Sequence, residues 1–150
     1  MKNIAFLGLM ALSLIACNSD DNNALDQEKP TVNITLPTEH QVFEPGDEIH
    51  VQALLTDNES LASYKIEIHS AGDGHTHSHS VLSANNHQEF HYDVSFEISG
   101  TSYEVNRSIT IPENAEEEHY HLGIFVLDSS GNQNQQFIEI YIGHDHHHHD

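Results

Sequence analysis

The sequence predicts an all-β fold, a disulfide-free antiparallel sandwich of seven strands. From residue 31 onward, apolar residues recur at every second position, which is the period of a strand with one buried face. Clusters of Gly, Pro, Asn, Asp and Ser separate these segments, and no apolar segment of helical period follows the N-terminal region. The single cysteine, Cys17, excludes a disulfide within the chain.

The first four strands are expected over residues 31–36, 48–55, 62–69 and 89–98. The first contains β-branched residues, and the other three carry apolar residues at alternate positions. These alternate positions are Ile49, Val51, Ala53 and Leu55, then Tyr64, Ile66 and Ile68, then Phe90, Tyr92, Val94, Phe96 and Ile98.

The last three strands are expected over residues 103–111, 119–127 and 136–142. Phe125 and Phe137 have the opposite parity to the apolar positions of their strands and should face outward. The inward positions of the last two strands are Tyr120, Leu122, Ile124 and Val126, then Ile138, Ile140 and Ile142.

Seven strands in about 110 residues suit an immunoglobulin-like sandwich. Residues 120–132 resemble the sixth strand and following turn of bacterial immunoglobulin-like repeats, with Tyr120 placed like their corner tyrosine. The whole chain resembles an uncharacterised family of immunoglobulin-like lipoproteins, a domain of unknown function from Bacteroidota. The segments that carry this resemblance are residues 14–17, 29–32, 46–49, 64–69 and 73–77. It implies the fold and brings no activity.

The chain is predicted to contain one folded domain between two short segments. Residues 1–16 hold an apolar run too short to span a bilayer and are expected to be a lipoprotein signal peptide, with lipidation at Cys17. Residues 17–30 are polar and acidic, as in a disordered tether. The domain should cover residues 31–143, and a His-rich tail covers residues 144–150.

This organisation predicts a lipid-anchored protein of the outer membrane. The start of the tether resembles the acidic signal that sends Bacteroidota lipoproteins to the cell surface, and a position facing the periplasm is the alternative. The net charge is −20 with neutral histidines, so the surface should repel nucleic acid and concentrate cations. The membrane contact is expected through the lipid alone.

Histidine is the most informative residue type, with 15 copies gathered in two clusters and at several strand ends. Neutral imidazole is a common ligand of transition metals. If the strands alternate in direction, all of the histidines fall at or near one end of the sandwich, opposite the end where the tether enters. The sequence therefore predicts a metal-binding end.

The leading site combines two strands with the loop between the third and fourth strands. His69 and His121 face outward on strands that neighbour each other in such sheets, so they are expected to be cross-strand partners. His119 lies beside them, and the loop supplies further donors. The predicted ligand set is His69, Asp73, His75, His77, His79, His119 and His121.

The C-terminal tail is expected to be native and to collect metal weakly, rather than to form a defined site. Its interruption by Asp145 and its end at Asp150 are atypical of a purification tag. Its donors are His144, His146, His147, His148 and His149.

Both methionines lie in the signal and Cys17 is expected to carry the lipid, which disfavours Cu⁺. Zinc is favoured, with Cu²⁺ and Ni²⁺ as alternatives, because of its availability outside the cytoplasm and its fit to tetrahedral nitrogen and oxygen ligands. At the opposite end, a minor calcium site of oxygen ligands is possible. Its residues would be Asp57, Asn58, Glu59 and Asp128, although turn chemistry explains the same residues.

These features favour capture or buffering of a divalent metal outside the cytoplasm, with an outer-membrane transporter as an expected partner. No HExxH helix, phosphate-binding loop or nucleophile elbow is present, so no enzyme activity is expected. The alternative is an adhesion or ligand-binding module for protein or glycan, in which the histidines are incidental or respond to pH.

Overall fold

The computed structural model describes residues 25–72 and 87–143, and this part of the chain contains strands and no helix. The all-β prediction is confirmed. The strands are β1 (Thr31–Leu36), β2 (Gln41–Phe43), β3 (Glu48–Thr56), β4 (Leu61–Ser70), β5 (Tyr92–Glu97), β6 (Ser102–Thr110), β7 (Glu118–Asp128) and β8 (Gln133–Ile142).

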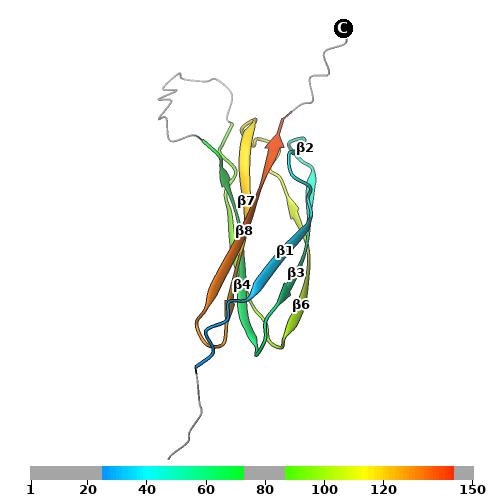
Figure 1. The fold of residues 1–150 in the computed structure, drawn as a ribbon. Helices are drawn as coiled ribbons and strands as arrows, with labels where there is room; N and C mark the ends of the chain where they lie inside the picture. Colours follow the sequence, from blue (N-terminus) through cyan, green and yellow to red (C-terminus); the bar gives the residue numbers. More distant parts are fainter. Residues whose placement is uncertain (1–24, 73–86, 144–150) are drawn as a thin grey trace, which may run out of the picture.

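The strands form two sheets packed face to face as an open sandwich (Figure 1). The smaller sheet has the order β1-β3-β6 and the larger has the order β2-β8-β7-β4-β5. All neighbouring strands are antiparallel except β2 and β8, which are parallel.

The prediction of seven antiparallel strands is therefore wrong in two respects: the described residues form eight strands, and one pair of neighbouring strands is parallel. After Leu36 the chain leaves the smaller sheet and adds the short strand β2 to the edge of β8. This strand has three residues, of which only Phe43 is buried. So short a strand shows no measurable alternation, and its position depends on a distant partner.

The strand predicted over residues 89–98 is shorter in the structure, where β5 begins at Tyr92 and ends at Glu97. It lies at the edge of the larger sheet and pairs with β4. Phe90 is buried, but Val94 is 36% exposed. The alternation is correct, but an edge strand is covered less completely than its sequence pattern indicates.

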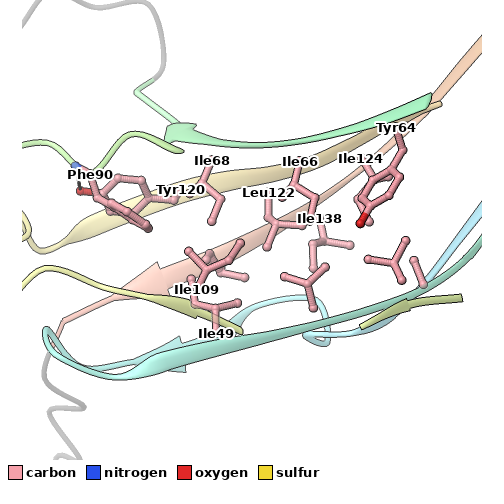
Figure 2. Packing of buried hydrophobic residues seen from close by; sticks show 14 of the residues in the cluster. Ile49, Tyr64, Ile66, Ile68, Phe90, Ile109, Tyr120, Leu122, Ile124 and Ile138 are labelled. Atoms are coloured by element: carbon pink, nitrogen blue, oxygen red, sulfur yellow. Dashed lines mark hydrogen bonds between the residues drawn. The ribbon is translucent and has the colours of Figure 1, made fainter. Parts of the chain in front are cut away.

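The core lies between the two sheets and follows the predicted alternation (Figure 2). In β3, every second residue from Ile49 to Leu55 is buried. The corresponding residues of β4 and β7 are also buried, and these two strands sit at the centre of the larger sheet. The fully buried members of β4 and β7 include Tyr64, Ile66, Ile68, Tyr120, Leu122 and Ile124.

Tyr120 anchors the loops at one end of this core. Its hydroxyl donates a hydrogen bond to the Glu116 carbonyl at 2.9 Å and accepts one from the Phe90 amide at 3.2 Å. Burial raises the pKa of this hydroxyl well above its ordinary value, so it stays protonated and available as a donor. The tyrosine thus joins the segments that precede β5 and β7.

The two ends of the sandwich differ in the chain segments they hold. One end, at the top of Figure 1, has the end of β4, the beginning of β7 and the end of β8. We call it the histidine end, because His40, His69, His119 and His121 lie there. The opposite end has the β3–β4 and β7–β8 turns and the segment that leads into β1.

Candidate metal site at the histidine end

His69 and His121 are direct cross-strand partners, as predicted. The antiparallel register of β4 and β7 pairs His69 with His121, and the register of β7 and β8 then places Glu139 beside His121. The neighbours of His69 and His121 in sequence, Ile68 and Leu122, are buried in the core. Strand alternation therefore turns both imidazoles to the outer face.

The two imidazole rings are in contact. Their centroids are 5.6 Å apart and their planes meet at 82°. The Phe137 ring packs against both, with centroid distances of 6.4 Å to each. Two nitrogen donors on paired strands, supported by a neighbouring aromatic ring, are held in a limited set of orientations, which favours a shared ligand.

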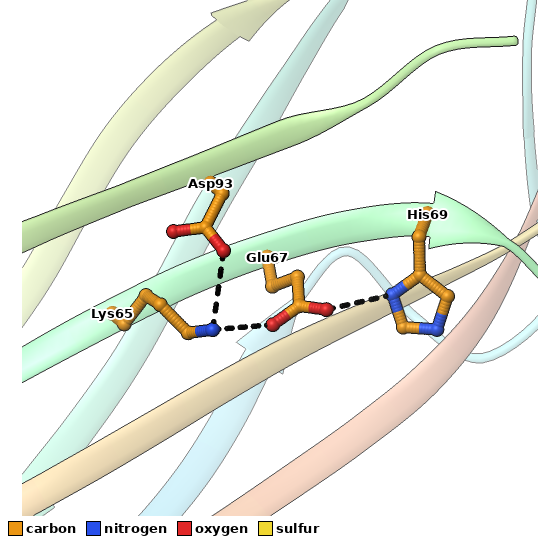
Figure 3. Close-up of polar contacts among 4 residues, drawn as sticks. All are labelled: Lys65, Glu67, His69 and Asp93. Atoms are coloured by element: carbon orange, nitrogen blue, oxygen red, sulfur yellow. Dashed lines mark hydrogen bonds and ion pairs between the residues drawn. The ribbon is translucent and has the colours of Figure 1, made fainter.

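A carboxylate lies behind the His69 ring. The Nδ1 atom of His69 is excluded from solvent and lies 3.2 Å from Oε1 of Glu67 (Figure 3), in an orientation that makes no hydrogen bond. A small turn of the imidazole ring would let Nδ1 donate to this carboxylate and leave Nε2 as the lone-pair donor. Histidine ligands of metals commonly have this arrangement.

Glu67 is itself held in place by Lys65. The Lys65 amine donates hydrogen bonds to Glu67 and, at 3.2 Å, to Asp93 on the neighbouring strand β5 (Figure 3). The hydrogen bond to Glu67 is the main reason that the pKa of Lys65 is raised. Lys65, Glu67 and His69 therefore form a row of polar side chains along the outer face of β4.

A second histidine cluster surrounds Glu139. Its Oε1 atom lies 2.9 Å from Nδ1 of His119 and 3.3 Å from Nδ1 of His40. The His119 ring also packs against Tyr141, with 5.1 Å between centroids. His40 reaches this position because its backbone amide donates to the Glu139 carbonyl at 2.7 Å.

Strand alternation correctly placed His40 at this end, but neither His40 nor Glu139 was among the predicted ligands. The position of Glu139 opposite His121 depends on the β7–β8 register, and that of His40 depends on the crossing from β1 to β2. The outward parity of Glu139 in its strand was a usable signal. For His40, the sequence indicated the end of the sandwich but not the contact with Glu139.

The described residues of this end supply pairs of donors rather than a complete tetrahedral set. Over residues 25–72 and 87–143, no three His, Cys, Asp or Glu ligand atoms at this end lie within 4.8 Å of one another. The remaining predicted ligands lie outside the described residues, as does the lipidation site Cys17. These ligands are Asp73, His75, His77, His79, His144, His146, His147, His148 and His149.

The other end carries the residues predicted for calcium. Asp57 and Asp128 come close together there, and they are joined by Asp26 from the segment assigned to the tether. Burial by itself raises the pKa of Asp128, but hydrogen bonds from Asn132, Ser130 and Gly131 outweigh it and lower that pKa below its ordinary value. Asp128 is therefore a buried anion at neutral pH.

A small aromatic patch continues from the histidines along the outer face of the larger sheet. The Phe125 and Phe137 rings meet edge to face at 5.3 Å, and the Lys65 amine lies 4.5 Å from the Phe125 centroid. Phe137 is 39% exposed, which confirms its outward parity. A shallow hollow beside the patch is lined partly by Ser95 and Gln135.

The described segments contain no helix long and apolar enough to cross a membrane. The architecture and the strand order define an all-β sandwich of two sheets, the architecture of immunoglobulin-like domains. A family model matches residues 15–143, and the chain belongs to that family, a domain of unknown function (DUF4625). A comparison with curated proteins found no match.

Several solved structures are similar to this chain at low sequence identity. Catalytically inactive OgpA from Akkermansia muciniphila, in complex with an O-glycopeptide, has a TM-score of 0.50 and 11% identity over 78% of this chain. This chain spans 30% of OgpA. The fibronectin(III)-like modules of Clostridium thermocellum CbhA have a TM-score of 0.45 and 18% identity, covering 81% of this chain and 53% of that one. A DUF4466 family protein from Parabacteroides merdae has a TM-score of 0.49 and 13% identity, covering 75% and 44%.

Proposed function

We propose that this protein captures or buffers a divalent transition metal, zinc before Cu²⁺ or Ni²⁺, outside the cytoplasm. The observation that carries the proposal is the cross-strand contact of His69 and His121, with Glu67 at the Nδ1 atom of His69. This pairing offers two nitrogen donors on a rigid sheet, one of them with a carboxylate 3.2 Å from its Nδ1 atom.

Further donors are close in sequence to this pair. Asp73, His75, His77 and His79 follow within ten residues of His69, in the segment that connects Gly72 to His87. A zinc ion needs three or four nitrogen or oxygen ligands, so one or two of these residues would complete the coordination. His119 and His40, which share Glu139, give a second place where an ion can be held.

The charge of the chain supports cation capture. With 24 acidic and 4 basic residues, the chain carries a strong negative charge that attracts divalent cations. Protonated imidazole cannot ligate a metal, so the captured ion would be released in acid. Capture at neutral pH and release on acidification fit a buffering or delivery role.

The proposed location is the outer membrane, through a lipid at Cys17. The described chain begins at the end of the sandwich opposite the histidines (Figure 1). An anchor attached through that end would leave the histidine end facing away from the lipid. The partner we propose is a transporter in the same membrane.

The test is a calorimetric titration of the metal-free full chain with Zn²⁺, Cu²⁺ and Ni²⁺. We expect a tight zinc equivalent that is weakened at least about tenfold in both His69→Ala and His121→Ala. His50→Ala is the matched control, because the His50 ring is hydrogen-bonded to Ser108 on the smaller sheet, away from His69 and His121. Equal affinity in all four proteins contradicts the proposal.

A second candidate function rests on the aromatic patch. Phe125, Phe137 and Lys65 lie beside a hollow on the same sheet face, which is typical of a surface that binds a protein or glycan. In this case Phe137→Ala would abolish binding to a glycan or protein array, while His69→Ala would not change it. The opposite result would leave the metal site as the function of this face.

A further inference from the structure

The end opposite the histidines holds three carboxylates in close proximity. Asp57 follows β3, Asp128 is the last residue of β7, and Asp26 precedes β1. Each of them places a carboxylate oxygen within 4.8 Å of the other two. Within residues 25–72 and 87–143, this is the one such group of three or more metal-ligating side chains. Asp128 is 2% exposed, so the group is partly enclosed by the protein.

Hydrogen bonds from the turns occupy only some of the oxygen atoms of these three carboxylates. Oδ1 of Asp128 accepts the amides of Ser130 and Asn132 at 2.8 Å each, and Oδ2 accepts the Asn132 side-chain amide at 2.7 Å. Oδ2 of Asp57 accepts the amides of Glu59 and Ser60 at 2.9 and 2.8 Å.

Asp26 shows the same division between its two oxygens. Its Oδ1 atom accepts the Glu28 amide at 3.0 Å and the Asn58 side-chain amide at 3.1 Å. Oδ2 of Asp26 and Oδ1 of Asp57, however, are excluded from solvent and accept no hydrogen bond from the described residues. The turn chemistry therefore leaves two buried anionic oxygens without a partner.

Such oxygens require a positive partner. Taking an ionised carboxylate oxygen out of water without a hydrogen bond or counter-charge is strongly unfavourable, and close like charges add to that cost. In the described segments, no Lys or Arg nitrogen lies within 4.0 Å of the three carboxylates; Lys65 pairs instead with Glu67 and Asp93. A bound cation would satisfy both unpartnered oxygens at once.

We propose that Asp26, Asp57 and Asp128 bind a calcium ion. The ligands are all oxygens, which selects a hard cation. Two oxygens up to 4.8 Å apart can both lie about 2.4 Å from one ion, the usual distance for calcium. Magnesium, at about 2.1 Å, needs a tighter group. Water and backbone carbonyls would complete the coordination, as in most calcium sites.

The ion would join the N-terminal segment to the domain. Asp26 precedes β1, whereas Asp57 and Asp128 belong to the two turns of this end. Weak links already exist, because the Asn132 side chain donates to the Asp26 carbonyl at 3.1 Å and Asn134 donates to the Pro30 carbonyl at 2.9 Å. Calcium would turn this contact into a clamp that fixes how the domain is oriented on the segment before it.

The experiment is a calcium titration of the metal-free full chain, followed by calorimetry, thermal unfolding and amide hydrogen exchange. We expect one calcium equivalent, a higher Tm and slower exchange of the Glu28 amide. Affinity should be on the order of 10⁻⁴ M or tighter. Asp26→Asn should weaken binding at least about tenfold and remove the Tm increase. This variant lies outside the core, so it should disturb the stability of the domain less than a change at the buried Asp128 would.

Two controls separate this site from the proposed function. Asp93→Asn removes a 45% exposed carboxylate on the outer sheet face and should leave calcium binding unchanged. His69→Ala should also leave it unchanged, because the histidine end is the opposite one. Absence of calcium binding at millimolar concentration overturns the proposal, as does equal binding by Asp26→Asn and the parent. Preferential binding of Mg²⁺ overturns the assignment to calcium.

Discussion

The two ends of this sandwich place metal-ligating side chains in opposite environments. At the histidine end, nitrogen donors lie on a sheet face, where the side chains of His69 and His119 are 34% and 61% exposed. At the carboxylate end, oxygen donors lie in turns and Asp128 is 2% exposed. The same strands, β4 and β7, connect the two.

Because of this difference, ion binding at the histidine end should affect the stability of the domain little, whereas ion binding at the carboxylate end should affect it directly. Exposed donors on a finished sheet can bind and lose an ion without disturbing the core, because the strands are held by ladder hydrogen bonds and by buried residues such as Ile66 and Leu122. Buried donors in turns are part of the fold, so their loss or occupation changes the stability of the domain.

Asp128→Ala should destabilise the domain by about 2–4 kcal/mol, because it leaves the amides of Ser130 and Asn132 without their acceptor in a buried turn. The free energy of unfolding by urea measures this effect. Asp93→Ala, an exposed carboxylate of the other region, should cost less than about 1 kcal/mol. Similar losses in both variants would remove the contrast between the two ends.

Glu67→Gln should lower zinc affinity about tenfold and leave stability nearly unchanged, because it weakens the contact to Nδ1 of His69 without touching the core. Zinc calorimetry and urea unfolding measure the two effects separately. Asp93→Asn is the control, since Asp93 also pairs with Lys65 but does not contact His69. An equal zinc affinity in Glu67→Gln and the parent would show that Glu67 does not contribute to zinc binding.

Tyr120→Phe should destabilise the domain by about 1 kcal/mol, because the Phe90 amide loses its acceptor and the Glu116 carbonyl loses its donor. This change tests how firmly the loops of the histidine end are held. Tyr141→Phe, on the outer face beside His119, should have a smaller effect on urea unfolding. A larger effect of Tyr141→Phe would mean that the outer face, rather than the core, fixes this end.

The stability difference between the parent and Asp128→Asn should depend on pH. The pKa of Asp128 is lowered by folding, so its contribution is present above the unfolded value, about 3.9, and is lost as pH falls through the lower folded pKa. We expect the Tm difference to be constant near neutral pH and to shrink in acid. A difference that grows as pH falls below about 4 would contradict this sign.

The sequence predicted most of the sandwich because strand alternation is local. Ile49 to Leu55 in β3 and Tyr120 to Val126 in β7 show it clearly, and the structure buries those positions. The His69–His121 pair could also be predicted, because it needs only outward parity and two neighbouring antiparallel strands. These inferences require no knowledge of the loops.

The remainder depended on contacts between residues far apart in the chain. β2 forms only because it pairs with the edge of β8. Glu139 contacts His40 and His119 because the β7–β8 register places it there. Asp26 reaches Asn58 across 32 positions in the sequence. Local patterns in the sequence contain no information on such contacts. The residue types therefore predicted nitrogen ligands at one end and oxygen ligands at the other, but not every residue that forms each site.

The central claim is that each end selects its own cation. The direct measurement is an amide NMR titration of the full chain with zinc and calcium, each added to the protein already saturated with the other. We predict that zinc shifts the amides around His69 and His121, and that calcium shifts those around Asp26 and Ser130. Zinc shifts confined to the carboxylate end, or no zinc shifts at the histidine pair, would contradict the claim.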